Sequence, residues 1–223
     1  MLLAIDTATR AVSLALHDGA RVRAEINWEL IDPHTVELTP RVAWLLGQVE
    51  GGARGLTGLA VSIGPGSFTG LRGGLAIAKG LALANGIPIV GIPTLDVVAC
   101  AQPAYKGPLV AVLHAGRGRL AAMTYKRGRG VWQAQGEVEV TTVDQIGQDW
   151  SKTTWLCGEL DAAERAAIRV RLGDRVALAS PAQSLRRAGF LAELGWRRLG
   201  SGTVDDLDSL KPLYIATAGV AAS

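Results

Sequence analysis

The chain has 223 residues, enough for one large domain or for two lobes of roughly 100 residues each. Apolar residues make up 48% of it, which supports a sizeable core and excludes a disordered adaptor. With 23 basic and 20 acidic residues the net charge is only +3, too balanced to indicate nucleic-acid binding by itself.

The cysteines and the apolar runs indicate where the protein works. Cys100 and Cys157 both stand in apolar surroundings and have no CxxC neighbour, which is typical of structural thiols in a reducing compartment. No uncharged apolar run reaches the roughly 20 residues that span a bilayer, and the first residues lack the pattern of a signal peptide. We therefore expect a soluble, cytoplasmic protein without membrane contact.

The first 30 residues predict an antiparallel meander. Apolar runs at 2–5 and 12–16 are followed by an alternating segment at 21–28, and Asp18-Gly19 is a strong hairpin signal. The first turn, 6–9, is polar and rich in hydroxyl groups.

A helix is expected next, over about 36–49. Its apolar residues have helical spacing, which leaves two readings open: a face packed in the core or a face that binds a partner. Pro40 leaves the start open too, because Thr39 could cap a helix that begins at Pro40, or a helix from His34 could bend there. The stripe consists of Leu38, Val42, Leu45, Leu46 and Val49, with Trp44 beside it.

Alternating strands and helices follow. A buried-type strand at 59–63 leads through a glycine-rich turn into a helix at 71–85, which Asn85-Gly86 ends. A strand at 87–92 and a helix at 95–101 complete the first half. This order favours a mixed sheet flanked by helices.

The second half repeats the opening pattern after a boundary at 102–108. Strands are expected at 109–113, 120–125, 131–140, 155–157 and 176–178, with helices at 161–172 and 181–199. Since both halves begin with strand, turn and strand, we predict an α/β protein of two duplicated lobes. The lobes are 1–104 and 105–223, and the final segment could pack back on the first lobe.

Two turns could carry chemistry. In the first turn, 6–9, an Asp followed by hydroxyl residues can hold Mg²⁺ and phosphate, or can simply close a β-turn. The second is the glycine-rich strand-to-helix turn at 64–70, which suits an anion. Alternatively, its glycines permit close packing, and Ser67 or Thr69 caps the helix. It fits neither the Walker A nor the GxGxxG pattern. The candidate phosphate-loop residues are Asp6, Thr7, Gly64, Gly66, Ser67 and Thr69.

The positions of the histidines and arginines bear on three kinds of site: a metal site, a catalytic triad and an RNA-binding patch. His17, His34 and His114 stand at no metal-ligand spacing, so neither a metal site nor a catalytic triad is predicted. The basic stretch 117–129 is interleaved with glycines and is typical of a solvated hairpin, with an RNA-facing patch as the alternative.

The run GPGSFTGLR at 64–72 resembles the hallmark stretch of the TsaB (YeaZ) family. The opening strand with its Asp6-Thr7 turn, the segment from His34 to Pro40, and Thr94-Leu95 after Gly86-Ile87-Pro88 are similar to that family as well. The match is good over about the first 100 residues and thinner beyond them, where 181–182 and 212–214 fit.

The resemblance implies a duplicated actin-like, hexokinase-like (ASKHA) fold and a role beside the related catalytic subunit TsaD. That subunit carries an HxxxH metal pair, whereas this chain has His34 and Leu38 at that spacing. The implied function is a non-catalytic scaffold that binds TsaD, and with it the ATPase TsaE, for threonylcarbamoyl transfer to adenosine 37 of tRNAs reading ANN codons. ATP or ADP could lie where the subunits meet, and tRNA contact would be indirect.

The implied partner interface lies on the two first-lobe helices, and the same face could form a homodimer without TsaD. It comprises His34, Leu38, Val42, Leu45, Leu46, Leu71 and Leu75. The rival hypothesis is a stand-alone ATPase or small-molecule kinase of the same fold that uses Asp6 and the 64–70 loop. One stretch of this chain departs from the family. The second lobe of family members opens with a DARRGEVY-like strand, and the corresponding stretch here is His114–Leu120.

Overall fold

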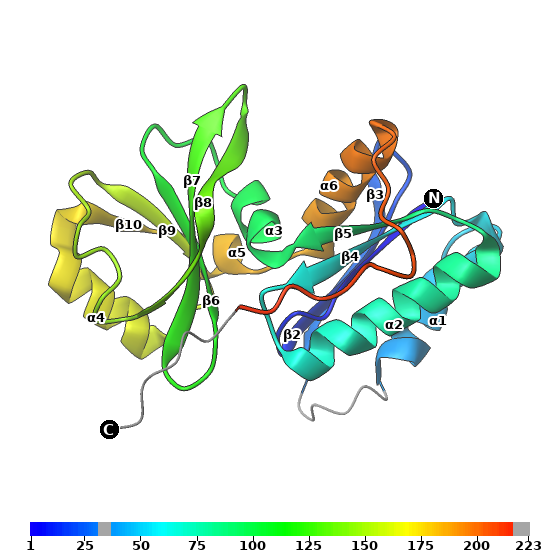
Figure 1. Cartoon of the computed structure of the whole chain (residues 1–223), viewed down its shortest axis with the longest axis horizontal. Coiled ribbons are helices and arrows are strands. Elements are labelled where there is room, and N and C mark those ends of the chain that lie inside the picture. The colour runs from blue at the N-terminus through cyan, green and yellow to red at the C-terminus, as the bar shows by residue number, and fades with distance from the viewer. Residues whose placement is uncertain (31–36, 216–223) are drawn as a thin grey trace.

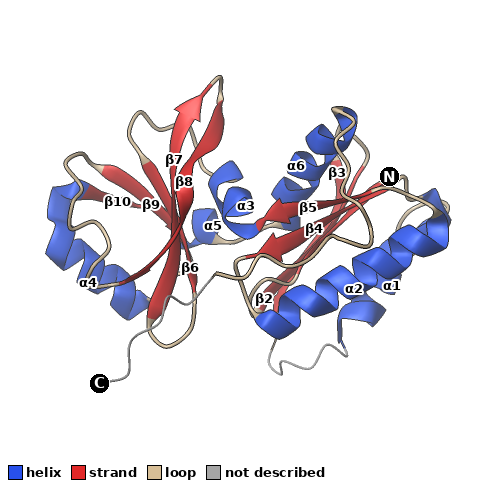
Figure 2. Ribbon diagram, in the orientation of Figure 1, coloured by secondary structure: helices blue, strands red, loops and turns tan. Residues whose placement is uncertain are grey.

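The structure is a computed structural model that describes residues 1–30 and 37–215. It has two lobes, each built on a five-stranded mixed sheet (Figures 1 and 2). The first sheet has the order β3-β2-β1-β4-β5: β1 pairs antiparallel with β2 and parallel with β4. Its strands are β1 (Leu2–Asp6), β2 (Ala11–His17), β3 (Val22–Glu29), β4 (Gly58–Gly64) and β5 (Ile89–Pro93).

The second sheet repeats the first strand by strand. Its order is β8-β7-β6-β9-β10, and β6 pairs antiparallel with β7 and parallel with β9, as β1 does with β2 and β4. Its strands are β6 (Leu109–His114), β7 (Arg119–Gly128), β8 (Val131–Thr142), β9 (Thr154–Gly158) and β10 (Val176–Leu178). The predicted duplicated two-lobe α/β fold is therefore confirmed.

Helices cover both faces of both sheets. On the first sheet, α1 (Leu38–Leu46) and α2 (Phe68–Asn85) cover one face and α6 (Ala188–Gly200) the other. On the second sheet, α4 (Ala162–Leu172) covers one face and α3 (Thr94–Cys100) the other. Within the described residues, two short 3₁₀ helices, η2 (Gly52–Gly55) and η3 (Gly173–Arg175), and the single-turn α5 (Pro181–Ser184) complete the elements.

The lobes exchange one helix each. Helix α3 follows the last strand of the first sheet, yet Leu95, Val98 and Ala99 pack in the core of the second sheet. Helix α6 follows the second sheet, yet Leu191 and Ala192 pack against the first. The two helices contact each other between the sheets (Figure 1).

Local structure differs from the prediction at two helix starts. Helix α1 begins at Leu38, so Pro40 lies in its first turn, where a missing N–H costs no hydrogen bond. Helix α2 begins at Phe68 rather than Leu71, and the Ser67 hydroxyl caps it by accepting from the Gly70 N–H at 3.3 Å.

The helix predicted over 181–199 is wrong as a single element. It is divided into α5 and α6 by an extended connection at 185–187. The periodic apolar residues gave no sign of this break, because its cause is the burial of one arginine, Arg186, in a polar cluster between the lobes.

Candidate functional site

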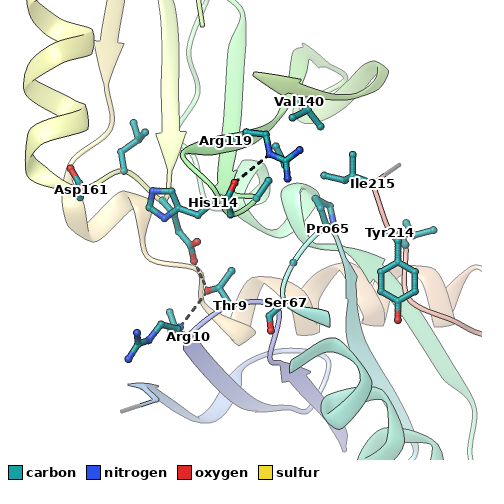
Figure 3. Close-up of a pocket in the computed structure, with 18 of the residues that line it drawn as sticks. Thr9, Arg10, Pro65, Ser67, His114, Arg119, Val140, Asp161, Tyr214 and Ile215 are labelled. Atoms are coloured by element: carbon teal, nitrogen blue, oxygen red, sulfur yellow. Dashed lines mark hydrogen bonds between the residues drawn. The ribbon is translucent and has the colours of Figure 1, made fainter. Parts of the chain in front are cut away.

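A cleft of about 890 Å³ lies between the two lobes (Figure 3). The carboxyl ends of β1, β4, β6 and β9 meet at its base, as expected where two duplicated parallel arrangements face each other. The first lobe supplies the turn at 9–11 and the loop at 65–67, and the C-terminal segment supplies 213–215. The second lobe supplies 114–116, Arg119 and 159–161.

The glycines of the 64–72 run admit the chain's own backbone. A Cβ on Gly66 would lie 2.2 Å from the Ala8 carbonyl oxygen, and one on Gly70 would lie 2.2 Å from that of Thr7. Gly64 has a φ of 117°, and a Cβ there would lie 2.4 Å from the Leu213 carbonyl oxygen. The loop was interpreted as either an anion site or a close-packed turn, and these contacts are those of a close-packed turn.

The second lobe has the counterpart of Gly64. Gly158 ends β9 as Gly64 ends β4, with a φ of 111°, and a Cβ there would lie 2.0 Å from the Val112 carbonyl oxygen. The symmetry of the two sheets extends to this residue. The sequence alone does not indicate that the two glycines correspond, because the residues around them share too little.

Asp6 is completely buried behind the lining of the cleft, where Arg186 connects it to the lining residues Thr9 and Glu159. Its Oδ1 accepts hydrogen bonds from the Ala8 N–H and the Ser62 hydroxyl, both at 3.0 Å. Its Oδ2 accepts from Nε of Arg186 at 2.7 Å. Both carboxylate oxygens are therefore engaged within the chain.

Arg186 joins the two lobes. Its Nη1 donates to Oε1 of Glu159 in the second lobe at 2.9 Å, and its Nη2 donates to the Thr9 hydroxyl at 3.0 Å. Nη2 also donates to the Ala11 carbonyl oxygen at 2.6 Å. Burial alone would lower the pKa of the guanidinium, but the charges of Asp6 and Glu159 and their hydrogen bonds raise it. The group therefore remains a cation.

This cluster is the part of the site that the sequence analysis missed. Thr9 was identified only as part of a polar turn, and Glu159 was not singled out. Arg186 lies 180 positions from Asp6 in a stretch with a helical pattern, so only the fold brings it there.

The remaining predicted loop residues have structural partners or lie at the surface. The Thr7 hydroxyl donates to the Gly70 carbonyl oxygen at 2.7 Å and so ties the first turn to α2. Thr69 is exposed in the first turn of α2. The six residues therefore do lie together, around the junction of β1, β4 and α2.

A clasp of three side chains holds the C-terminal segment over this junction. The Phe68 ring stacks on the Tyr214 ring with centroids 5.4 Å apart, and the Arg72 guanidinium carbon lies 3.7 Å from the Phe68 ring centroid. Nε of Arg72 donates to the Tyr214 hydroxyl at 2.9 Å. The clasp joins residues of the 64–72 run to the distant 212–214 segment.

The divergent second-lobe stretch forms the opposite wall. His114 is half exposed, and its Nε2 lies 2.9 Å from Oε2 of Glu164 on α4. Arg119 also faces the cleft. By contrast, Lys126, Arg127 and Arg129 lie at the other end of β7. The usual rise per residue of a β-strand places them roughly 20 Å from Arg119. The basic stretch is thus two separate groups rather than one patch.

The residues assigned to a partner interface lie in the core of the first lobe. Six of them are at most 6% exposed and pack between the first sheet and helices α1 and α2, because the apolar side of each helix faces the sheet. His34 lies outside the described residues. Any interface on these helices therefore has to use their other sides. The six are Leu38, Val42, Leu45, Leu46, Leu71 and Leu75.

Within 1–30 and 37–215, no group of three or more His, Cys, Asp and Glu side chains is arranged to hold a metal ion. None of the helices in that part of the chain is long and apolar enough to cross a membrane. Cys157 is buried and Cys100 partly so, and both are free thiols.

Comparison with known proteins identifies the family. The family model described as tRNA N6-adenosine threonylcarbamoyltransferase, TsaD, matches residues 29–157. The tRNA threonylcarbamoyladenosine biosynthesis protein TsaB of Escherichia coli is 36% identical over 149 residues, 65% of this chain and 63% of that protein. TsaB of Bacillus subtilis is 28% identical over 97% of this chain and 94% of that protein.

A solved structure has the same fold. YeaZ from Pseudomonas aeruginosa is 24% identical, has a TM-score of 0.77, and aligns over 96% of this chain and 99% of its own. The match to the E. coli relative covers a little under two thirds of that protein, whereas the Bacillus and Pseudomonas matches are nearly complete. The chain therefore belongs to the TsaB (YeaZ) family of tRNA threonylcarbamoyladenosine biosynthesis proteins, which shares its domain with TsaD.

Proposed function

We propose that the chain is a non-catalytic subunit of cytoplasmic threonylcarbamoyladenosine synthesis and that it binds TsaD through the outward side of α1 and α2. The proposal is supported above all by one observation, the uncharged exposed line along α2. Small or apolar residues follow one another there at helical spacing, and a Cβ on Gly80 would have nothing within 4 Å. The line consists of the exposed Thr69, Ala76, Gly80, Leu83 and Ala84 and the half-buried Gly73.

Such a line suits a second helix. Small residues let two helix backbones approach closely, and an uncharged exposed face gains from being covered. Leu83 is 74% exposed on α2, and Trp44 is 57% exposed on the neighbouring helix α1. These two side chains would supply the apolar contact area that the buried leucines cannot supply.

The test is Gly80→Glu. Glutamate has a higher helix propensity than glycine by roughly 0.5–1 kcal/mol and has room here, so α2 should be at least as stable as before. A charge in the middle of the face should abolish co-elution with purified TsaD in size-exclusion chromatography with light scattering. Val170→Glu is the matched control, since Val170 is 88% exposed on α4 of the other lobe. Full binding by Gly80→Glu would refute this interface.

The same face would serve two further contacts. Without TsaD it would pair with a second copy of the chain, so Gly80→Glu should also shift the sedimentation coefficient towards that of a monomer.

TsaE, and ATP or ADP, would join at or near the contact with TsaD, with tRNA held indirectly. Nucleotide binding by the assembled complex but not by the isolated chain is the expected result in equilibrium dialysis.

A further inference from the structure

Behind the lining of the interlobe cleft, a cage of oxygen atoms surrounds a cation. Asp6 Oδ2 and Glu159 Oε1, from different lobes, lie 2.7 and 2.9 Å from nitrogens of Arg186. The Thr9 hydroxyl and the Ala11 carbonyl oxygen lie 3.0 and 2.6 Å from the third nitrogen. Carboxylate, hydroxyl and carbonyl oxygens are the ligands that hard divalent cations prefer.

The residues do not fit a metal-bound phosphate in this arrangement. The two-lobed fold raises the expectation that Asp6 holds Mg²⁺, but both of its carboxylate oxygens accept hydrogen bonds from the chain and none of its surface is exposed. The Arg186 side chain is only 1% exposed, so it fills the space between the two carboxylates. A divalent cation could enter only by displacing it.

We propose that Arg186 is a built-in substitute for a divalent cation: it joins the carboxylates of the two lobes and closes the base of the cleft to metal-bound phosphate. A tethered guanidinium cannot diffuse away, and its planar fork can reach four oxygens at once. The inference concerns the chain alone and does not depend on the proposed contact with TsaD.

The backbone around Arg186 is built to deliver it. The residue lies in the extended connection between α5 and α6, where the chain passes from the second lobe to the first. On one side the Ser180 hydroxyl caps α5, and on the other the Ala188 N–H donates to the Ser13 hydroxyl at 2.7 Å. In a continuous helix this side chain would point in another direction, so the extended connection is what places it between the two carboxylates.

Arg186→Ser tests the substitution directly. Removing the guanidinium leaves two carboxylates without their cation, so the thermal midpoint should fall by about 10 °C. If the cage is a cation site, added Mn²⁺ or Mg²⁺ should restore the midpoint in a concentration-dependent way. Electron paramagnetic resonance should then show Mn²⁺ bound to the variant but not to the unaltered chain.

Two controls define the outcome. Arg187→Ser removes the neighbouring arginine, which is half exposed and pairs with the largely buried Glu25 outside the cage, and it should show no metal-dependent recovery. Adding Glu159→Gln to Arg186→Ser should abolish the recovery, because one of the two carboxylates is lost. Equal Mn²⁺ binding by the unaltered chain, or an Arg186→Ser midpoint that Mn²⁺ does not raise, would overturn the proposal.

A milder variant covers the case in which Arg186→Ser does not fold. Arg186→Lys keeps the charge, but a single ammonium cannot span four oxygens from both lobes. Its amide hydrogen exchange should rise on both sides of the cleft, in 65–72 and 115–119, without a change in the exchange of β4 and β6. Exchange equal to that of the unaltered chain would contradict the bridging role.

Discussion

At the scale of single residues, the glycines of α2 separate two roles that look alike in sequence. Gly74 and Gly80 both lie inside the helix, where an alanine is intrinsically favoured by roughly 0.5–1 kcal/mol. A Cβ on Gly74 would lie 2.1 Å from Oγ1 of Thr7, whereas one on Gly80 would meet nothing. Contact with the β1 turn requires the first glycine, whereas no contact within the part of the chain that the structure describes requires the second.

This contrast gives a paired prediction. Gly74→Ala should lower the free energy of unfolding by about 1–3 kcal/mol, because the Thr7 side chain must move from its hydrogen bond with Gly70. Gly80→Ala should raise it by up to about 1 kcal/mol. Urea unfolding followed by circular dichroism measures both, and equal effects of the two substitutions would refute the assignment.

The cysteines allow a second prediction at this scale. Burial raises the pKa of the Cys100 thiol to about 11 and raises that of Cys157 as well. At pH 8 both should stay protonated and react slowly with iodoacetamide, because the thiolate is the nucleophile. Modification of Cys100 should speed up as the pH rises towards 11. Rapid labelling of the folded chain at pH 8, scored by mass spectrometry against a urea-unfolded control, would contradict this.

At the scale of elements, few of the described contacts hold residues 213–215. Besides the clasp of Phe68, Arg72 and Tyr214, the Leu213 N–H donates to the Ile63 carbonyl oxygen at 2.6 Å. The segment therefore covers the end of β4 and the start of α2 without forming a strand or helix of its own.

Tyr214→Ala should release this segment while leaving the lobes intact. Hydrogen–deuterium exchange should increase over 210–215 and 63–68, since both the ring stack and the hydrogen bond to Arg72 are lost. Tyr214→Phe keeps the stack and should show a smaller increase. Exchange in α4 is the internal reference, and an increase there of the same size would indicate global destabilisation instead.

At the scale of the whole molecule, the exchange of α3 and α6 makes each lobe incomplete without the other. The fragment 1–104 lacks α6, so one face of its sheet, which includes Leu2, Ala60 and Val90, would be exposed. We expect it not to fold alone, and we expect co-expression with 105–223 to give a soluble complex. A fragment that unfolds cooperatively as a monomer would refute this dependence.

The sequence predicted the architecture better than the site. Alternating strands and helices and the hairpin signals depend on local pattern, so the duplicated α/β fold and most elements were predicted correctly. The break at 185–187 was not, because its cause is a contact with Asp6 that is distant in sequence. The apolar stripe of α1 fits a core and an interface equally well, and only the packing places Leu38 and Leu45 inside. The symmetry of Gly64 and Gly158 is likewise visible only once both sheets are built.

The exchanged helices also affect how the chain is made. Synthesis runs from the N-terminus, and the first sheet is complete in sequence at Pro93, but the helix that covers its second face ends only at Gly200. At the usual pace of translation the ribosome needs roughly 5–20 s for that interval. Throughout it, an apolar face of the nascent first sheet lacks its native cover and is exposed to whatever chaperone or neighbouring chain is at hand.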